Sequence, residues 1–242
     1  MFNLVYKLYN ASAILIEWPQ QIDTAILHDI LAFKAKLQAG NFINIKYLNH
    51  AYASLLIHYD VLNFDVAIEQ QKLKDVYKSV TSKNVSEQTL WKIPVCYDLD
   101  FGIDLKALAL EKQMDVGAII ERYSKPIYTV FFIGFLPGFL YLGGLDKRLF
   151  TPRKATPRLA INEGAVAIGG EQTGIYPTKS PGGWHIIGNS PIRFFDVLKE
   201  VPCFVKAGDC IQFYPVNLNT HQDIKTLVDA GVYQIESEVL HG

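Results

Sequence analysis

A short stretch bounded by prolines, Thr151 to Arg158, has the residue types that most clearly suggest chemistry, and we call it the arginine loop. It carries Arg153 and Arg158, each directly after a proline. Proline fixes φ and biases the residue before it to extended backbone, so both guanidinium groups lie on a stiff loop. An arginine fork binds carboxylate or phosphate through paired hydrogen bonds. The loop is a candidate site for an anionic ligand; the alternative is a solvated loop whose arginines bond to backbone carbonyls.

The spacing of the two arginines limits how they act together. Arg153 and Arg158 are five positions apart, which on a regular strand places their side chains on opposite faces. Both reach one ligand only if the loop bends. One of the two arginines is therefore open to a structural role.

A second segment, Gly169 to His185, is polar and rich in Gly and Pro, yet it holds Tyr176 and Trp184. Such rings are costly to leave in water, so we expect a shaped surface loop in which both bind the substrate. His185 follows Trp184 on an expected strand, with its side chain on the opposite face. Histidine exchanges protons near neutral pH, so His185 is the candidate catalytic residue, and the alternative is a hydrogen-bonded structural histidine.

A third segment, Gly134 to Gly144, alternates glycines and a proline with aromatic bulk. It can bring main chain close to a ligand while aromatic faces form a wall, and the alternative is a tightly packed barrel corner. The residues expected to line the site or a partner interface are Phe135, Pro137, Phe139, Tyr141, Gly182 and Gly183.

The common catalytic signatures are missing from the sequence. There is no Gly-x-x-x-x-Gly-Lys-Ser/Thr loop, so ATP, if used here, is not held by a P-loop. The six histidines are scattered and no Cys-x-x-Cys occurs, so no metal site is expected. Gly-x-Ser-x-Gly is also absent, which removes the simplest serine-hydrolase interpretation.

The composition bounds the class of protein. The chain has 242 residues, 50% of them hydrophobic, enough for one large or two small cores. Its formal charge of −1 provides no basic field for nucleic acid or anionic lipid, so neither is an expected partner. The odd set Cys96, Cys203 and Cys210 predicts reduced packing residues rather than disulfides. With no signal-peptide pattern and no membrane-spanning run, we expect a cytoplasmic protein.

The first part of the chain, residues 1–82, is predicted to form a small α+β domain. Apolar residues at helical spacing predict a helix from Ile22 to Leu37, which Gly40 ends. Asp65 is the expected N-cap of a second helix that runs to about Val80. A polar stretch between Val80 and Leu90 predicts a linker. The β-prone runs are Leu4–Tyr9, Ala13–Trp18, Phe42–Leu48 and Ser54–Tyr59.

The next part, residues 90–216, favours a closed or nearly closed antiparallel β-barrel, because short β runs alternate with dense turn signals. Asp104 and Asp115 are the expected caps of helices ending at Gln113 and Tyr123. Residues 217–242 are expected as a tail with a helix from Asp223 to Ala230. The expected strands are Trp91–Tyr97, Tyr128–Phe135, Ala165–Gly169, Trp184–Gly188, Phe194–Val197 and Cys210–Tyr214.

Several linked motifs resemble the B-subunit family of 5-oxoprolinase, also described as kinase A inhibitors and as allophanate hydrolase subunit 1. The resemblance covers nearly the whole chain, although the first eighty residues contribute a pattern rather than a motif. The motifs are Ile93–Tyr97, Gly134–Leu142, the two Pro-Arg pairs of the arginine loop, and Ser180–Gly188.

The resemblance implies an α+β fold, with the small N-terminal domain followed by a cyclophilin-like β-barrel. It implies a hydrolase component that opens 5-oxo-L-proline to L-glutamate at the expense of ATP and Mg, together with a cyclophilin-like C subunit and a separate A subunit. The chain would be inactive alone and would hold no tightly bound cofactor. Arg153 and Arg158 would face the substrate carboxylate or the phosphorylated intermediate. Because no complete catalytic set is visible in the sequence itself, we expect the active site at the junction with the partner chain.

The sequence departs from the family pattern at two places. Tyr123 stands where a histidine is common, and Asn189-Ser190 replaces a frequent Arg-Thr, which bears on the choice of substrate or partner. Three alternatives remain. The same family name records a regulatory protein that inhibits a sensor histidine kinase, and related systems process urea or allophanate. The barrel alone suggests a peptidyl-prolyl isomerase, although fold does not confer activity.

Overall fold

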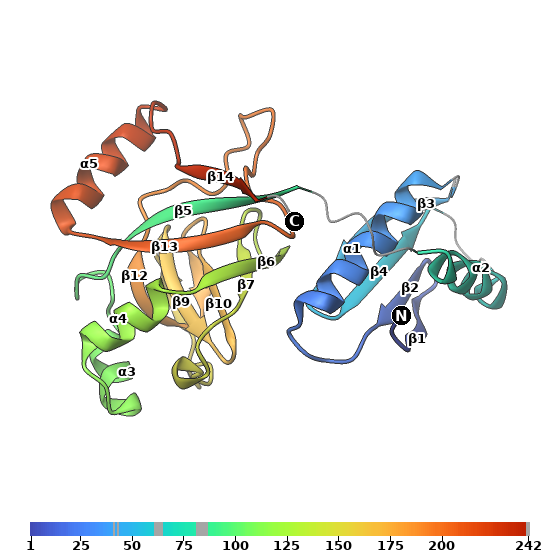
Figure 1. Ribbon diagram of the computed structural model, residues 1–242, viewed down its shortest axis with the longest axis horizontal. Coiled ribbons are helices and arrows are strands. Elements are labelled where there is room, and N and C mark those ends of the chain that lie inside the picture. The colour runs from blue at the N-terminus through green and yellow to red at the C-terminus, as the bar shows by residue number, and fades with distance from the viewer. Residues whose placement is uncertain (41, 43, 61–64, 81–86, 241–242) are drawn as a thin grey trace. The chain divides into compact units, whose positions relative to one another are not determined.

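The structure is a computed structural model that describes residues 1–40, 42, 44–60, 65–80 and 87–240. It divides into two compact units, residues 1–86 and 87–242 (Figure 1). Most of the linker expected between Val80 and Leu90, residues 81–86, lies outside the described residues. Each unit has a hydrophobic core of its own.

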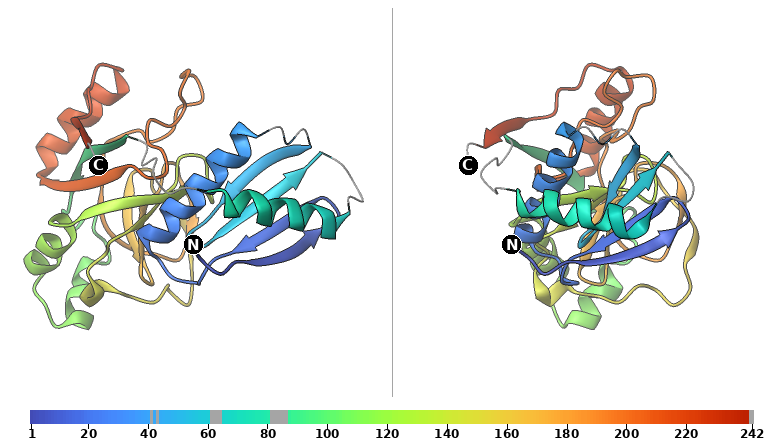
Figure 2. Two further views of the ribbon diagram at one scale, coloured as in Figure 1. Left: turned by 45° about the vertical axis from the view of Figure 1, so that its right-hand side comes forward. Right: turned by 90° about the vertical axis from the view of Figure 1, so that its right-hand side faces the viewer.

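In the first unit, helices α1 (Thr24–Ala39) and α2 (Val66–Lys78) pack on one face of an antiparallel sheet (Figure 2). Ile16 and Leu55 pair across the sheet and share the core with Ile30 of α1 and Leu73 of α2, so both helices cover the same face. The strand order in the sheet is β1 (Val5–Asn10), β2 (Ala13–Glu17), β4 (Ser54–Tyr59) and β3 (Ile45–His50).

The helix ends of this unit follow from local sequence. Asp65 accepts hydrogen bonds from first-turn N–H groups of α2, and Asp23 does the same for α1. Gly40 ends α1 by donating its N–H to the last turn. The predicted start after Asp65 and stop at Gly40 are confirmed. The strand predicted from Phe42 is wrong at its start, because β3 begins at Ile45.

Within the described residues, seven strands of the second unit close into a barrel. Closure comes where Asn189 of β12 pairs with Cys96 of β5. The predicted α+β class and the predicted barrel are confirmed. The strand order is β12 (His185–Asn189), β9 (Ala165–Gly169), β10 (Gln172–Ile175), β7 (Leu140–Gly143), β6 (Ile127–Ile133), β13 (Cys210–Val216) and β5 (Gln88–Cys96).

One pairing differs from the antiparallel arrangement predicted. β13 runs parallel to β5, with Cys210 opposite Leu90 and Val216 opposite Cys96. Antiparallel neighbours can be joined by a tight hairpin, whereas parallel neighbours need a long connection. Here the chain passes through the rest of the barrel between β5 and β13, so that connection is available.

The remaining elements of this unit surround the barrel. Residues from 217 on, predicted as a tail, belong to the second unit. β14 and β12 pair with the same edge of β5, β14 at its first residues and β12 at its last residue, Cys96. The helix predicted from Asp223 begins earlier, because Asn217 caps it by accepting the N–H of Thr220. These elements are α3 (Leu105–Lys112), α4 (Val116–Ser124), η1 (Lys147–Leu149), β8 (Arg158–Ile161), which pairs with β11 (Ser180–Gly182), α5 (Leu218–Asp229) and β14 (Ser237–Leu240).

Two predictions from composition are wrong. Residues 194–197 form no strand. The apolar Phe194 is instead buried outside any strand and stacks on Phe204, at 5.8 Å between ring centroids. Residues 169–185 are not a surface loop, since they contain β10 and β11 and buried rings. Their glycines allow close packing: a Cβ on Gly174 would lie 2.4 Å from the Leu140 carbonyl oxygen.

The cysteines are free thiols, with Cys96 and Cys210 buried and Cys203 half-buried. Burial raises the pKa of each thiol, which keeps it protonated and unreactive and agrees with the predicted packing role. Across the described parts of the chain, no helix has both the length and the apolar character needed to cross a bilayer.

Candidate functional site

The arginine loop is fastened along the start of β12. Lys154 donates its backbone N–H to the carbonyl of Gly183 at 2.7 Å. The carbonyl of Pro152 lies 2.9 Å from Nε2 of His185. These two contacts flank Arg153, so its position is set by the barrel even though its side chain is exposed.

Arg153 presents a guanidinium that is only lightly engaged. Its carbon Cζ lies 5.7 Å from the centre of the Trp184 ring, and Nη2 donates to Oε1 of Gln172 at 3.2 Å. No carboxylate of the described residues forms a salt bridge with it. An exposed guanidinium held against an aromatic face and lacking an acidic partner is suited to bind an anion.

Arg158 is held differently. Both ends of its fork bond to Asp104: Nη1 to Oδ2 at 2.9 Å and Nη2 to Oδ1 at 2.7 Å. Nζ of Lys154 lies 3.0 Å from the same Oδ1. The two arginines therefore have separate roles in the fold, and the predicted substrate contact of Arg158 stays a prediction.

Asp104 was predicted to cap α3, and this is wrong. It stands at the N-cap position, but its side chain makes no hydrogen bond to the first turn. Oδ2 instead accepts the backbone N–H of Ile186 at 2.7 Å, in addition to the bond from Arg158. Burial acts to raise the pKa of this carboxyl, but the bonds from Arg158, Ile186 and Lys154 outweigh it and the pKa is lowered. A buried carboxylate with two cationic partners is more strongly stabilised there than at a helix end.

Behind Arg153 lies an aromatic cluster centred on Phe139. Its ring centroid lies 5.1 Å from that of Tyr176, 5.5 Å from Trp184 and 4.8 Å from Tyr141. Tyr176 and Trp184 are 2% and 4% exposed, so they form a wall of the site from within the core. Their predicted contact with substrate is untested, and of the two, Trp184 is the ring that Arg153 covers.

The glycine Gly182, near the end of this segment, is required by close packing. A Cβ on Gly182 would lie 2.3 Å from the hydroxyl oxygen of Tyr176, so any other residue would displace the phenol. Burial and the nearby Tyr141 hydroxyl raise the pKa of Tyr176 to about 12. The hydrogen bond from the backbone N–H of Trp184 acts in the opposite direction but is outweighed. Tyr176 therefore stays neutral under physiological conditions.

Phe135 combines exposure with backbone strain. Its φ is +65°, in the left-handed region that bulky residues rarely adopt, and its side chain is 60% exposed. The ring stands edge-on to Phe139 at 5.5 Å. Pro137 beside it is also exposed. Strain and an exposed aromatic ring at one position are typical of a surface that contacts a ligand or partner.

His185 is half-buried, and its bonding fixes the ring tautomer. A backbone carbonyl only accepts, so Nε2 must carry the proton that it donates to Pro152. In the neutral ring Nδ1 is then the acceptor. The predicted catalytic role is thus confined to Nδ1.

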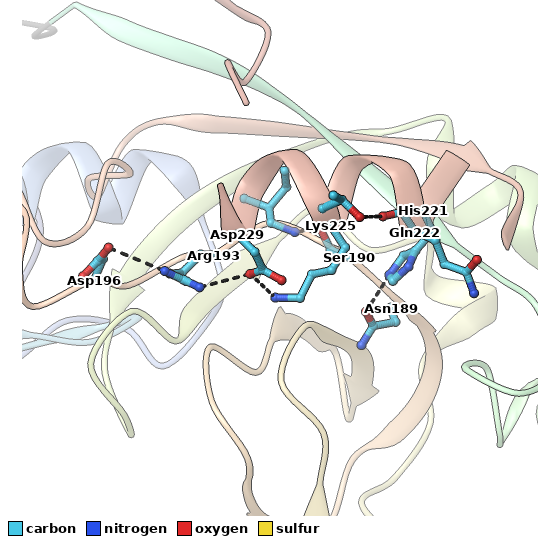
Figure 3. Close-up of polar contacts among 10 residues, drawn as sticks. Asn189, Ser190, Arg193, Asp196, His221, Gln222, Lys225 and Asp229 are labelled. Carbon is cyan, nitrogen blue, oxygen red and sulfur yellow. Dashed lines mark hydrogen bonds and ion pairs between the residues drawn. The ribbon is translucent and has the colours of Figure 1, made fainter. Parts of the chain in front are cut away.

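Asn189 and Ser190, which depart from the family pattern, are buried. Figure 3 shows Asn189 below α5, where its Oδ1 lies 2.8 Å from Nε2 of His221. Its Nδ2 donates to the carbonyl of Glu163 at 2.8 Å. Asn189 joins α5 to the barrel, and both ends of its amide are used within the chain. Tyr123, the other departure, is fully buried with its hydroxyl 2.6 Å from that of Thr173.

The site thus gathers Arg153, Trp184, Tyr141 and His185 around the arginine loop, while Arg158 turns to Asp104. Sequence reasoning missed Asp104 and Lys154 as parts of this site, and it missed His221. The position of Lys154 beside Arg153 was a usable signal, whereas Asp104 lies too far away in sequence. Among the described residues, no group of His, Cys, Asp and Glu is arranged to hold a metal ion.

The chain resembles known proteins over most of its length. A family model for the carboxyltransferase domain, subdomain C and D, matches residues 4–205. A protein named as the B subunit of 5-oxoprolinase from Bacillus subtilis (strain 168) is 32% identical over 218 residues, 85% of this chain and 90% of that protein. One of the same name from Haemophilus influenzae (strain ATCC 51907 / DSM 11121 / KW20 / Rd) is 49% identical over 122 residues, covering 50% and 57%. The chain belongs to this carboxyltransferase-domain family, among the proteins named as B subunits of 5-oxoprolinase.

Longer proteins contain a similar part. Urea amidolyase from Saccharomyces cerevisiae (strain ATCC 204508 / S288c) is 33% identical over 277 residues, 98% of this chain and 14% of that protein. The solved structure of TTHA0988 matches with a TM-score of 0.73 at 30% identity, covering 85% of this chain and 40% of that one. The urea amidolyase of K. lactis matches with a TM-score of 0.85 at 20% identity, over 98% of this chain and 16% of that one, and shows the fold alone.

Proposed function

We propose that this chain is the B subunit of an ATP-dependent 5-oxoprolinase and opens 5-oxo-L-proline to L-glutamate together with the C and A subunits. The observation that carries the proposal is the exposed Arg153 guanidinium on the Trp184 ring, in a chain of this family. The substrate has a carboxylate and a flat five-membered lactam ring. An arginine fork beside an aromatic wall fits both groups.

In this proposal the chain mainly binds and orients the substrate. Arg153 pairs with the carboxylate, which fixes the lactam relative to the barrel. Nδ1 of His185 accepts a proton during water attack, and Pro152 keeps the ring in the required tautomer. The five-membered lactam is a stabilised amide. ATP with Mg, used by the assembled enzyme, would phosphorylate the amide oxygen and so activate the carbonyl carbon toward water. The ring C–N bond would then break, its nitrogen would take up a proton, and a second water would release phosphate.

The partner surface in the proposal is the strained Phe135 with Pro137 beside it. Lys154 and Arg158 are paired with Asp104, which in this proposal leaves Arg153 and His185 for the substrate, short of a complete catalytic set. We therefore place the active site at the junction with the C subunit. The expected assembly is a hetero-oligomer of three different chains, and the barrel provides one wall of the site.

The test is ATP-dependent release of glutamate from 5-oxo-L-proline by this protein alone, with the C subunit, and with both the C and A subunits. The expected result is activity only in the full mixture. Omitting this chain from that mixture is the matched control. Activity without it, or no glutamate in any mixture, overturns the proposal.

A second candidate is a component of an enzyme that acts on urea or allophanate. The specific observation in its favour is the yeast urea amidolyase, which matches 98% of this chain at 33% identity. The same mixtures supplied with urea or allophanate distinguish the two. Ammonia release that exceeds glutamate release would replace the first proposal with the second.

A further inference from the structure

Asp104 is the point where three segments of the site meet. Its side chain is 5% exposed and takes bonds from Arg158 and Lys154 of the arginine loop. It also accepts the backbone N–H of Ile186, two residues beyond Trp184 on β12. The Asp104 carboxylate thus links Lys154, the neighbour of Arg153, to β12, the strand that follows Trp184.

Because its side chain makes these bonds, Asp104 does not cap α3. Asp115 occupies the same place on α4 and accepts the N–H of Ala118 at 2.7 Å. Asp104 stands at the N-cap of α3 with helical dihedral angles and makes no such bond. Since an N-cap aspartate ordinarily satisfies first-turn donors, its side chain serves the loop rather than the helix.

We propose that Asp104 is the positioning residue of the substrate site, which holds the arginine loop against β12 so that Arg153 stays on the Trp184 ring. The effect on catalysis rests on the proposed function, whereas the effect on the loop does not. Asp104 touches no substrate and acts through Lys154 and Arg158. Without its charge these two cations, which share one oxygen atom, repel each other and the loop lifts.

The first test is limited digestion of the full chain with trypsin, with cleavage sites mapped by mass spectrometry. Trypsin can cut the loop after Arg153 and after Lys154, since neither is followed by proline. Asp104→Asn is expected to speed cleavage there by about tenfold, the scale set by losing bonds to charged groups. Asp115→Asn, the same change at a true helix cap, leaves this rate unchanged.

The second test is a comparison of KM and kcat for 5-oxo-L-proline in the full mixture of the three chains. Asp104→Asn is expected to raise KM about tenfold with little change in kcat, because Arg153 binds the carboxylate away from the reacting amide. A variant that merely reduces the folded fraction lowers the apparent kcat and leaves KM alone. Asp115→Ala, which loses the cap of α4, supplies that comparison.

A further variant covers the case in which Asp104→Asn does not fold. Lys154→Met keeps the Asp104–Arg158 pair and removes only the contact beside Arg153. It is expected to speed cleavage after Arg153 and to raise KM in the same direction. Wild-type cleavage rates in the folded variants overturn the positioning role. An inactive wild-type mixture overturns the proposed function, and the digestion still decides the role of Asp104.

Discussion

The guanidinium of Arg153, in the arginine loop, lies over the ring of Trp184, which directly precedes β12, at 5.7 Å from the ring centre. A cation–π contact at an exposed site contributes only about 0.5–1 kcal/mol. The arginine is therefore oriented by the ring but not locked by it, and it keeps donors for a ligand. This relationship is the basis of the proposed substrate site.

Replacing Arg153 tests that site directly. We expect Arg153→Ala to raise KM for 5-oxo-L-proline by a factor of about ten or more, because a charge-assisted hydrogen-bonded pair is lost. Arg153→Lys should recover part of this, since an ammonium keeps the charge but not the fork. Arg148→Ala removes an exposed arginine paired with Asp146 and should leave KM unchanged. A wild-type KM in Arg153→Ala would place the carboxylate elsewhere.

His185 offers a test of proton transfer. Asn and Gln both keep an amide in place of the ring, and neither can take up a proton. We expect His185→Gln to retain the bond to the Pro152 carbonyl, to fold normally and to lower kcat by about 10²-fold or more, the usual contribution of a general base. A variant with the wild-type kcat would make His185 a structural residue.

Phe135 should act on association rather than on folding. Glycine adopts positive φ without strain, so Phe135→Gly is expected to stabilise the isolated chain or leave it unchanged, within about 1 kcal/mol. The same change removes an exposed ring and should weaken binding to the C subunit. Urea unfolding measures the first effect and titration calorimetry the second. Leu110→Ala, an 82% exposed position on α3, is the control expected to change neither. Wild-type affinity in Phe135→Gly would remove this loop from the interface.

His221 predicts a dependence of stability on pH. It is 6% exposed, with Nδ1 buried and unpartnered within the described residues, and burial followed by the charge of Lys225 lowers its pKa. Below the unfolded value of about 6.5, the unfolded chain then binds more protons than the folded one, so the free energy of unfolding falls with falling pH. Above that value this stability is fully present.

The measurement is urea unfolding at several pH values between about 7.5 and 5.5, the range around the unfolded pKa. His221→Gln keeps a donor for Asn189 and cannot titrate, so its stability should fall less over this range than that of the wild type. If the free energy of unfolding falls equally with falling pH in both proteins, groups other than His221 govern the loss of stability in acid. Figure 3 shows the location of the effect, at the contact between α5 and the barrel.

Much of the local structure was predictable because its causes lie within a few residues. Asp65, Gly40 and Asp115 set helix ends through bonds to adjacent turns, and the strand at Ala165–Gly169 was predicted at its observed bounds. The buried course of residues 169–185 was not predictable from their polarity. Their glycines pack against a strand that only the closed barrel brings near, as Gly174 does against Leu140.

The α+β class, the barrel and the family were predictable from the amino-acid sequence alone, as was the placing of Arg153 and Arg158 directly after prolines. Proline geometry, apolar spacing and linked motifs are properties of residues close together in the sequence, so they can be recognised without knowing the fold. Which arginine is paired and which is available depends on contacts that exist only in the folded chain. Asp104 bonds to Arg158 rather than to its own helix because closure of the barrel brings a cation 54 positions away within 2.7 Å, and no local pattern records that distance.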